Sequence, residues 1–128
     1  MELEIAVPPG ELVDKVTILE IKLERIKDAA KLRNIAHEYA VLAATMKDKI
    51  AETPALAALR ADLKRANEAI WQAEEDVRAF ERRQDFGRPF VEAARSVYFN
   101  NDRRAELKRR INEMFGSKLI EEKSHDPY

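Results

Sequence analysis

The chain has 128 residues, of which 45% are hydrophobic and 37% are charged, and it contains three glycines, five prolines and no cysteine. This composition is typical of a single helix-rich globular domain spanning residues 1–128, and it excludes a disordered chain, a disulfide scaffold and thiolate chemistry. The formal net charge of −1 excludes the strongly basic balance expected of a nucleic-acid-binding domain.

The N-terminal stretch MELEIAVPPGEL is acidic, and no apolar run approaches the length of a membrane span, so we expect a cytoplasmic location. Its first seven residues alternate, with Leu3, Ile5 and Val7 on one side, which is the period of a half-buried strand. The other strand-like segment is KLIEEKS at 118–124. Since a lone strand needs a partner, we predict that the two ends pair or at least lie together.

Two amphipathic helices are predicted next. Apolar residues recur every three or four positions over 12–30, which predicts a helix that begins near Glu11. The same spacing over 32–50 is shifted in phase, so we favour a break with Asp28 capping the second helix. A continuous helix of roughly 60 Å, at 1.5 Å per residue, is the alternative.

The third predicted helix carries the longest regular apolar seam of the chain. Thr53 is placed to cap it, and Pro54 suits the first helical position because its missing N–H costs nothing there. Apolar residues then keep a spacing of three and four over 56–80. We predict a helix of about 29 residues, roughly 43 Å long, that ends before DFGRP.

A fourth helix is expected from Pro89 to about Asn100, followed by a fifth that ends at Gly116. The apolar positions of the two are out of phase, and NND at 100–102 offers a break and a cap. With three heptad-like seams, the chain is predicted to be an all-α, elongated antiparallel helical bundle with coiled-coil-like packing.

Strings spread over nearly the whole chain carry a resemblance: PPGELVDKVTILEIKLERI, AKLRNI, NEAIW, ERRQDFG, ARSVYFNNDRRAELKRRIN and SKLIEEKS. Together they resemble a family of small bacterial proteins of unknown function. The resemblance implies a bacterial, cytoplasmic setting, and it brings no established reaction, cofactor or catalytic residue.

A polar stripe lies beside the apolar seam of the third predicted helix, because Asn67, Trp71, Glu74 and Arg78 follow a 4-3-4 spacing. In one interpretation, Trp71 covers the edge of the core and Glu74 pairs with Arg78 on the helix surface. In the other, the stripe is the wall of a groove in which Trp71 stacks and Arg78 binds an anionic or carbonyl group.

Three residues of the fourth predicted helix would complete such a ligand site. If the third and fourth helices pack antiparallel, Arg95, Tyr98 and Asp102 should converge with the stripe. The simpler interpretation of Asp102 is a helix cap. A basic patch follows, which is a solvated face, a docking face for an acidic protein or, less simply, an RNA-binding face. It comprises Arg103, Arg104, Lys108, Arg109 and Arg110.

Metal and catalytic templates fit poorly. The one Glu-x-x-His pair, Glu122 and His125, lies in the last ten residues, and three glycines cannot build a phosphate loop. Asp14 lies in the first turn of the first predicted helix, where an acid complements the helix dipole, so we assign it to no site. We therefore expect no metal, no cofactor and no catalytic residue.

The pattern favours a non-enzymatic module that acts by protein–protein interaction, with a protein partner or a homodimer. Two alternatives stay open: a small-molecule-binding protein or small enzyme built on the polar stripe, and an RNA-associated factor built on the basic patch.

Overall fold

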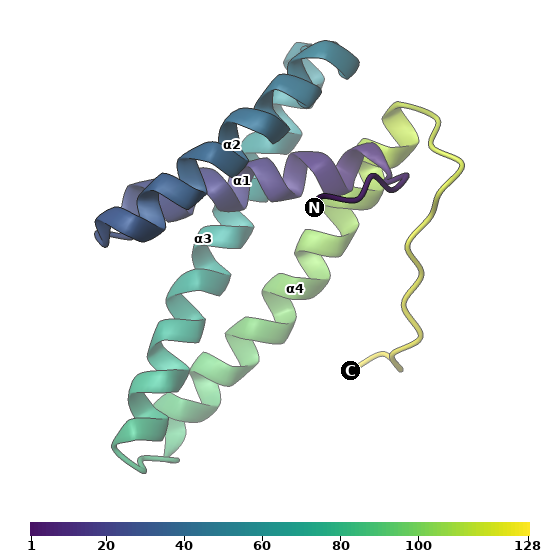
Figure 1. The fold of residues 1–128 in the computed structure, drawn as a ribbon. Coiled ribbons are helices and arrows are strands. Elements are labelled where there is room, and N and C mark those ends of the chain that lie inside the picture. The colour runs from purple at the N-terminus through teal and green to yellow at the C-terminus, as the bar shows by residue number, and fades with distance from the viewer.

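The computed structural model describes residues 1–128 and is all-helical, as predicted. It has no strand and four helices: α1 (Pro9–Arg25), α2 (Ala29–Lys49), α3 (Pro54–Arg82) and α4 (Arg88–Met114). They form two helical hairpins, and α1 of the first hairpin lies across both helices of the second (Figure 1). No helix combines the length and the apolar character that crossing a membrane would require.

The predicted starts of the second and third helices are confirmed. The Asp28 side chain caps α2 by accepting a hydrogen bond from the Lys31 N–H at 2.9 Å. Thr53 Oγ1 caps α3 by accepting from the Leu56 N–H at 3.1 Å, and Pro54 is the first residue of this helix. The break near Asp28 and the 29-residue length of α3 are therefore as expected.

The predicted break at residues 100–102 is wrong, because α4 is one continuous helix of 27 residues. The Asn100 side chain does not cap a new helix; its Nδ2 donates to the Ser96 backbone carbonyl at 2.8 Å, within the same helix. The apparent change of phase arises because polar residues occupy seam positions. The seam keeps a spacing of three and four when they are included: Phe90, Ala93, Val97, Asn100, Arg104, Leu107 and Ile111.

The predicted strand pairing of the two ends is also wrong. Residues 1–8 and 118–128 are extended, but neither forms a ladder, and Leu3 and Ile5 are each 78% exposed. Two short strands are marginal without a third strand or a covering helix, and neither is present here. Both ends nevertheless contribute side chains to one open hollow of about 450 Å³.

The core lies where α1 crosses the α3–α4 hairpin. Its residues come from all four helices, with α2 contributing Met46 from the outer side of α1. Because α1 packs against each of the other helices, it is the central element of the fold. The most fully buried large side chains of the core are Val13, Val16, Leu56, Leu63, Leu107 and Ile111.

The α3–α4 hairpin continues well beyond this crossing. We call residues 76–95 the distal arm, and residues 56–73 with 97–112 the proximal half; the arm extends away from α1 and α2 (Figure 1). Within the arm only Ala93 is buried, whereas Val77 and Phe80 are half-buried. The seam of the arm is thus shared by two helices and covered by no third.

Candidate functional site

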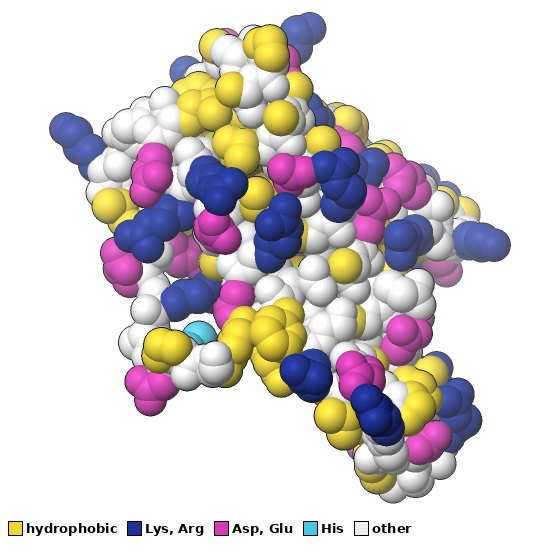
Figure 2. Space-filling model, turned by 180° about the vertical axis from the view of Figure 1, so that it is seen from behind, with side chains coloured by type: hydrophobic (Ala, Val, Ile, Leu, Met, Phe, Trp, Pro, Cys, Tyr) yellow, Lys and Arg dark blue, Asp and Glu magenta, His cyan; other side chains and the backbone are white.

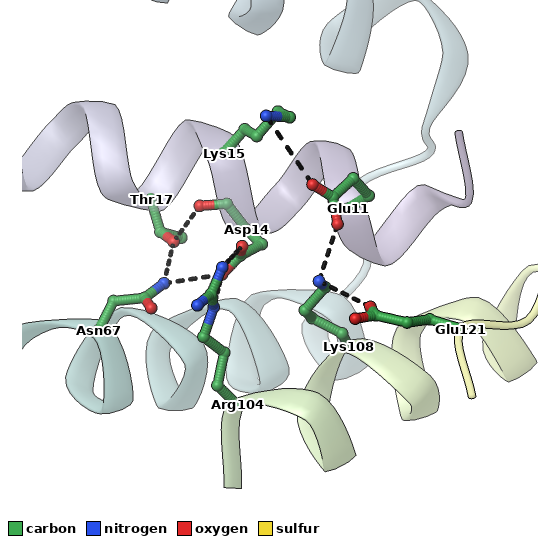
Figure 3. Close-up of polar contacts among 8 residues, drawn as sticks. All are labelled: Glu11, Asp14, Lys15, Thr17, Asn67, Arg104, Lys108 and Glu121. Atoms are coloured by element: carbon green, nitrogen blue, oxygen red, sulfur yellow. Dashed lines mark hydrogen bonds and ion pairs between the residues drawn. The ribbon is translucent and has the colours of Figure 1, made fainter. Parts of the chain in front are cut away.

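A buried polar network joins α1, α3 and α4 where they cross (Figure 3). Its centre is Asp14, whose side chain is only 1% exposed. Arg104 of α4 binds this carboxylate in a bidentate manner, with Nε 2.9 Å from Oδ1 and Nη2 2.7 Å from Oδ2. Asn67 of α3 donates from Nδ2 to Asp14 Oδ1 at 2.9 Å and to Thr17 Oγ1 at 3.0 Å.

The negative charge of Asp14 is balanced by the positive charge of Arg104 within the network. Hydrogen bonding to Asp14 raises the pKa of Arg104 above its already high ordinary value, against the lowering effect of burial. A buried ion pair of this kind adds little net stability compared with apolar residues. Removing one partner, however, leaves an unpaired charge in the interior and lowers the stability of the fold. The network therefore fixes where α1 sits on the hairpin.

A second branch of the network surrounds Lys108, whose side chain is 9% exposed. Its Nζ lies 2.7 Å from Glu11 Oε2 and 3.0 Å from Glu121 Oε2 (Figure 3). Burial lowers the pKa of Lys108, but its hydrogen bonds to the two carboxylates outweigh burial, so the pKa is raised overall. The same contact with Lys108 lowers the pKa of Glu121.

Gly10 brings the start of α1 into direct contact with α4. Its N–H donates to Asn112 Oδ1 at 2.6 Å, and both residues are buried. A Cβ at position 10 would strike the Lys108 carbonyl oxygen and lie 2.7 Å from Asn112 Oδ1. Only glycine permits this approach, so the PPG sequence serves the crossing of the helices as well as the start of α1.

Ion pairs also join the second half of α1 to α3. Glu20 Oε1 lies 2.6 Å from Arg60 Nη2, and Glu24 Oε1 lies 2.6 Å from Lys64 Nζ. The hydrogen bond from Lys64 to Glu24 raises the pKa of Lys64. These pairs are partly or fully exposed, so each contributes little by itself.

Every buried side-chain nitrogen or oxygen of the protein, those of the network included, has a hydrogen-bond partner. No three His, Asp or Glu side chains lie close enough together to hold a metal ion. The network joins α1 to α3 and α4, and we call it the interhelical lock.

The polar stripe of α3 borders an open hollow of about 390 Å³ on the flank of this lock. Asn67, Trp71, Glu74 and Arg78 all line it, together with Ile18 and Ile21 of α1 and Arg104 of α4. Asn67 is committed to the network, and Arg78 pairs with Glu74 on the helix surface. Trp71 is half-buried, and the guanidinium of Arg25 lies 6.0 Å from its ring centroid.

The three predicted residues of α4 lie elsewhere. Arg95 covers the ring of Phe99 at 5.5 Å, and the ring of Tyr98 lies 5.6 Å from that of Tyr128. Asp102, within the continuous α4, caps no helix and accepts a hydrogen bond from the Tyr128 hydroxyl. The structure thus divides the predicted set between the hollow beside Trp71 and a surface near the end of the chain.

The predicted basic patch does not form one face. Arg104 and Lys108 point into the network, whereas Arg109 and Arg110 are exposed and pair with acids, Arg110 with Glu106 at 2.5 Å. Only Arg103 lacks an ion pair. Figure 2 shows Lys and Arg side chains interspersed with Asp and Glu rather than gathered in a single basic field.

Comparison with known proteins gives one match. The family model described as "Family of unknown function (DUF6165)" matches residues 1–127. The chain belongs to this family. The match over residues 1–127 confirms the resemblance to a family of unknown function. No curated protein matches the chain, and no solved structure does either.

The most buried residues of the network escape the sequence patterns. Asp14 is wrongly dismissed as a first-turn acid, and Thr17 is overlooked, because both fall outside the apolar seam of α1. A signal did exist: Gly10, Asp14, Thr17 and Ile21 have a 4-3-4 spacing, and all four are buried. A second stripe that mixes small, polar and apolar residues indicates a helix buried on two sides.

Proposed function

We propose that this protein is a bacterial, cytoplasmic and non-enzymatic helical module that binds a protein partner through the distal arm of the α3–α4 hairpin. One observation carries the proposal: four residues of the α3 seam are buried in the proximal half, Leu56, Leu63, Ala66 and Ala73, whereas neither Val77 nor Phe80 of the same seam is buried in the arm. A partner helix is the natural cover for the open part.

The burial of individual seam residues supports this proposal. Leu63 and Ala66, which lie under α1, are 0% and 3% exposed. Val77 and Phe80 continue the same spacing farther along α3 but are only half-buried. Because the spacing of three and four continues into the arm, a helix from another protein could pack there in a coiled-coil manner.

The tip of the arm has the composition of an interface. Phe86 is 50% exposed, and its ring meets that of Phe90 edge-to-face at 5.3 Å. The guanidinium of Arg83 lies 4.8 Å from the ring centroid of Phe80. Aromatic residues and arginine are the types enriched at protein–protein contacts, and hydrophobic side chains are exposed among charged ones at this tip (Figure 2).

A protein partner fits the surface charge better than RNA does. Four of the five residues of the predicted basic patch already pair with acids, and those pairs would have to break before the cations could contact phosphates.

Small-molecule binding is the second candidate, favoured by the hollow beside Trp71. Its volume and its mixture of isoleucine, tryptophan and polar side chains suit a small ligand. Since Trp71 is the only tryptophan, a ligand that enters the hollow should change the tryptophan fluorescence of the whole protein.

Site-specific photocrosslinking in the native host tests the leading proposal. A photoreactive amino acid replaces Phe86, and the matched control replaces Val41 on α2, which is 51% exposed. We expect one discrete protein adduct from position 86 and none from position 41. The adduct protein is then purified, and its affinity for the chain should fall at least tenfold with Phe86→Asp but not with Val41→Asp. Equal adducts at the two positions, or equal affinities, contradict the proposal.

A further inference from the structure

The last part of the chain, residues 117–128, which we call the tail, lies along α4. The N–H of its first residue, Ser117, donates to the Asn112 carbonyl at 2.9 Å, and beyond Ser117 the tail is held by side chains alone. It runs back from the end of α4 toward its middle (Figure 1). Outside the helices, no backbone–backbone hydrogen bond reaches past Ser117, and all residues from 118 to 128 are exposed. The tail is therefore bound to α4 in the way that a separate peptide would be.

Two acidic residues anchor the middle of the tail. Glu121 pairs with the mostly buried Lys108, and Glu122 Oε1 lies 3.4 Å from Arg109 Nη2. Lys108 is also held by Glu11, with Nζ 2.7 Å from Glu11 Oε2, and this contact does not involve the tail. α4 thus presents a prearranged cationic contact for a carboxylate.

An aromatic residue anchors the far part of the tail. The ring of Tyr128 lies 4.7 Å from Phe99 and 5.6 Å from Tyr98, and its hydroxyl donates to Asp102. Tyr98 and Phe99 remain 44% and 42% exposed even with the tail in place. They form an aromatic platform that Tyr128 covers only in part.

Between the two anchors the tail stands off from α4. An open hollow of about 1040 Å³ separates them, bordered by Asn101 and Ala105 of α4 and by Lys123 and His125 of the tail. The tail therefore contacts both ends of this surface of α4 but leaves the centre of the surface open. A segment with larger side chains between its anchors would make closer contact.

We propose that the face of α4 between Tyr98 and Arg109 is a docking groove for an extended acidic segment of a partner protein, and that the tail occupies this groove in cis and limits access to it. The segment carries two adjacent carboxylates and an aromatic residue six or seven positions later, as the tail does with Glu121, Glu122 and Tyr128. Charge complementarity with Lys108 and Arg109 selects the acids, and the Tyr98–Phe99 platform selects the aromatic ring. This groove is separate from the distal arm, so it does not depend on the partner proposed there.

Competition between the tail and a free peptide tests the groove in the full chain. The release variant combines Glu121→Gln with Tyr128→Ala, both at exposed positions, so the fold should persist and is checked by circular dichroism. The probe is a fluorescent peptide with the sequence SKLIEEKSHDPY. A tethered tail acts as a competitor at a high effective concentration, so the release variant should bind the probe at least tenfold more tightly than the unaltered chain.

Two controls show whether a change in probe binding comes from release of the tail. Glu106→Gln removes an ion pair with Arg110 away from the tail and should leave probe binding unchanged. A probe with glutamines for its two adjacent glutamates and alanine for its tyrosine should bind neither protein. If a folded release variant binds the intact probe no better than the unaltered chain, the groove proposal is overturned.

A second copy of the chain is the competing occupant, and cysteine pairing distinguishes it in this cysteine-free protein. Ala105 and Lys123 line the same hollow, so a flexible thiol crosslinker that spans the hollow should join Ala105→Cys and Lys123→Cys of one chain in a monomeric product. Covalent dimers formed on mixing the two single variants would show that tails exchange between copies, and would overturn the assignment to a separate partner.

Discussion

In its proximal half the α3–α4 hairpin packs under α1, and in its distal arm it packs only on itself. Both halves carry apolar residues at intervals of three and four, yet Leu63 is fully buried while Val77 and Phe80 are only partly buried. The difference comes from α1, which the Asp14–Arg104 network fixes at one place on the hairpin. Spacing makes a segment a helix with an apolar face, but a third element decides whether that face is covered.

Truncation of seam residues should show the largest difference between the two halves. Leu63→Ala opens a cavity in the covered core and should lower the free energy of unfolding by roughly 3–5 kcal/mol. Val77→Ala removes two carbons from a partly buried position and should cost only about 1 kcal/mol. Urea unfolding measures both, and equal losses would mean that the arm is as well packed as the proximal half.

Asp14→Ala tests what holds α1 on the proximal half. It leaves Arg104 and Asn67 without their partner, and we expect a loss of about 3 kcal/mol, near the low end for buried pairs because Arg104 is partly exposed. The matched control is Glu74→Ala, which breaks an exposed pair with Arg78 and should change stability by no more than about 0.5 kcal/mol. A loss for Asp14→Ala as small as that of the control would show that the network does not hold α1.

The polar stripe of α3 runs from one half to the other, so substitutions along it should give a gradient. Asn67→Ala removes donors to two buried oxygens and should cost about 2 kcal/mol. Trp71→Ala should cost about 1 kcal/mol because the ring is half-buried. Arg78→Ala should cost less than about 0.5 kcal/mol. Thermal unfolding of the three variants gives the order of the stability losses. Equally large losses would show that the core extends as far as Arg78.

The tail contacts α4 within the proximal half, and its attachment should depend on pH. The hydrogen bond to Asp102 raises the pKa of Tyr128 to about 12. Since the raised pKa favours the neutral phenol, this anchor is present below the ordinary pKa of about 10 and is lost as the pH rises through the raised value. Absorbance titration should show one late-ionising tyrosine that is absent in Tyr128→Phe and shifted down in Asp102→Asn. An unchanged titration in Asp102→Asn would show that Tyr128 is not anchored by a hydrogen bond to Asp102.

The fold was predictable wherever apolar spacing and capping residues agree. Thr53 with Pro54 and the uninterrupted seam of α3 predict that helix correctly, as does Asp28 for the start of α2. The prediction fails in α4, where Asn100 and Arg104 occupy seam positions and make one helix look like two. It also fails at the two ends, because strand-like alternation does not supply a neighbouring strand.

The candidate site was less predictable than the fold. Asn67 and Arg104 stand out in the sequence, but the residue that joins them, Asp14, lies 53 positions from one and 90 from the other. A contact between helices at that separation depends on the angle at which α1 crosses the hairpin. Local spacing carries no information on that angle. The 4-3-4 stripe that starts at Gly10 indicates only that α1 has a second buried face.

Hydrogen–deuterium exchange along α3 and α4 tests the central claim most directly, since it reports the local stability of each half in a single unmodified protein. We predict that amides of the distal arm, residues 76–95, exchange at least tenfold faster than those of residues 58–68, and that a bound partner slows the arm selectively. Uniform protection along both helices would contradict the account, because the arm would then be as firmly held as the half that α1 covers.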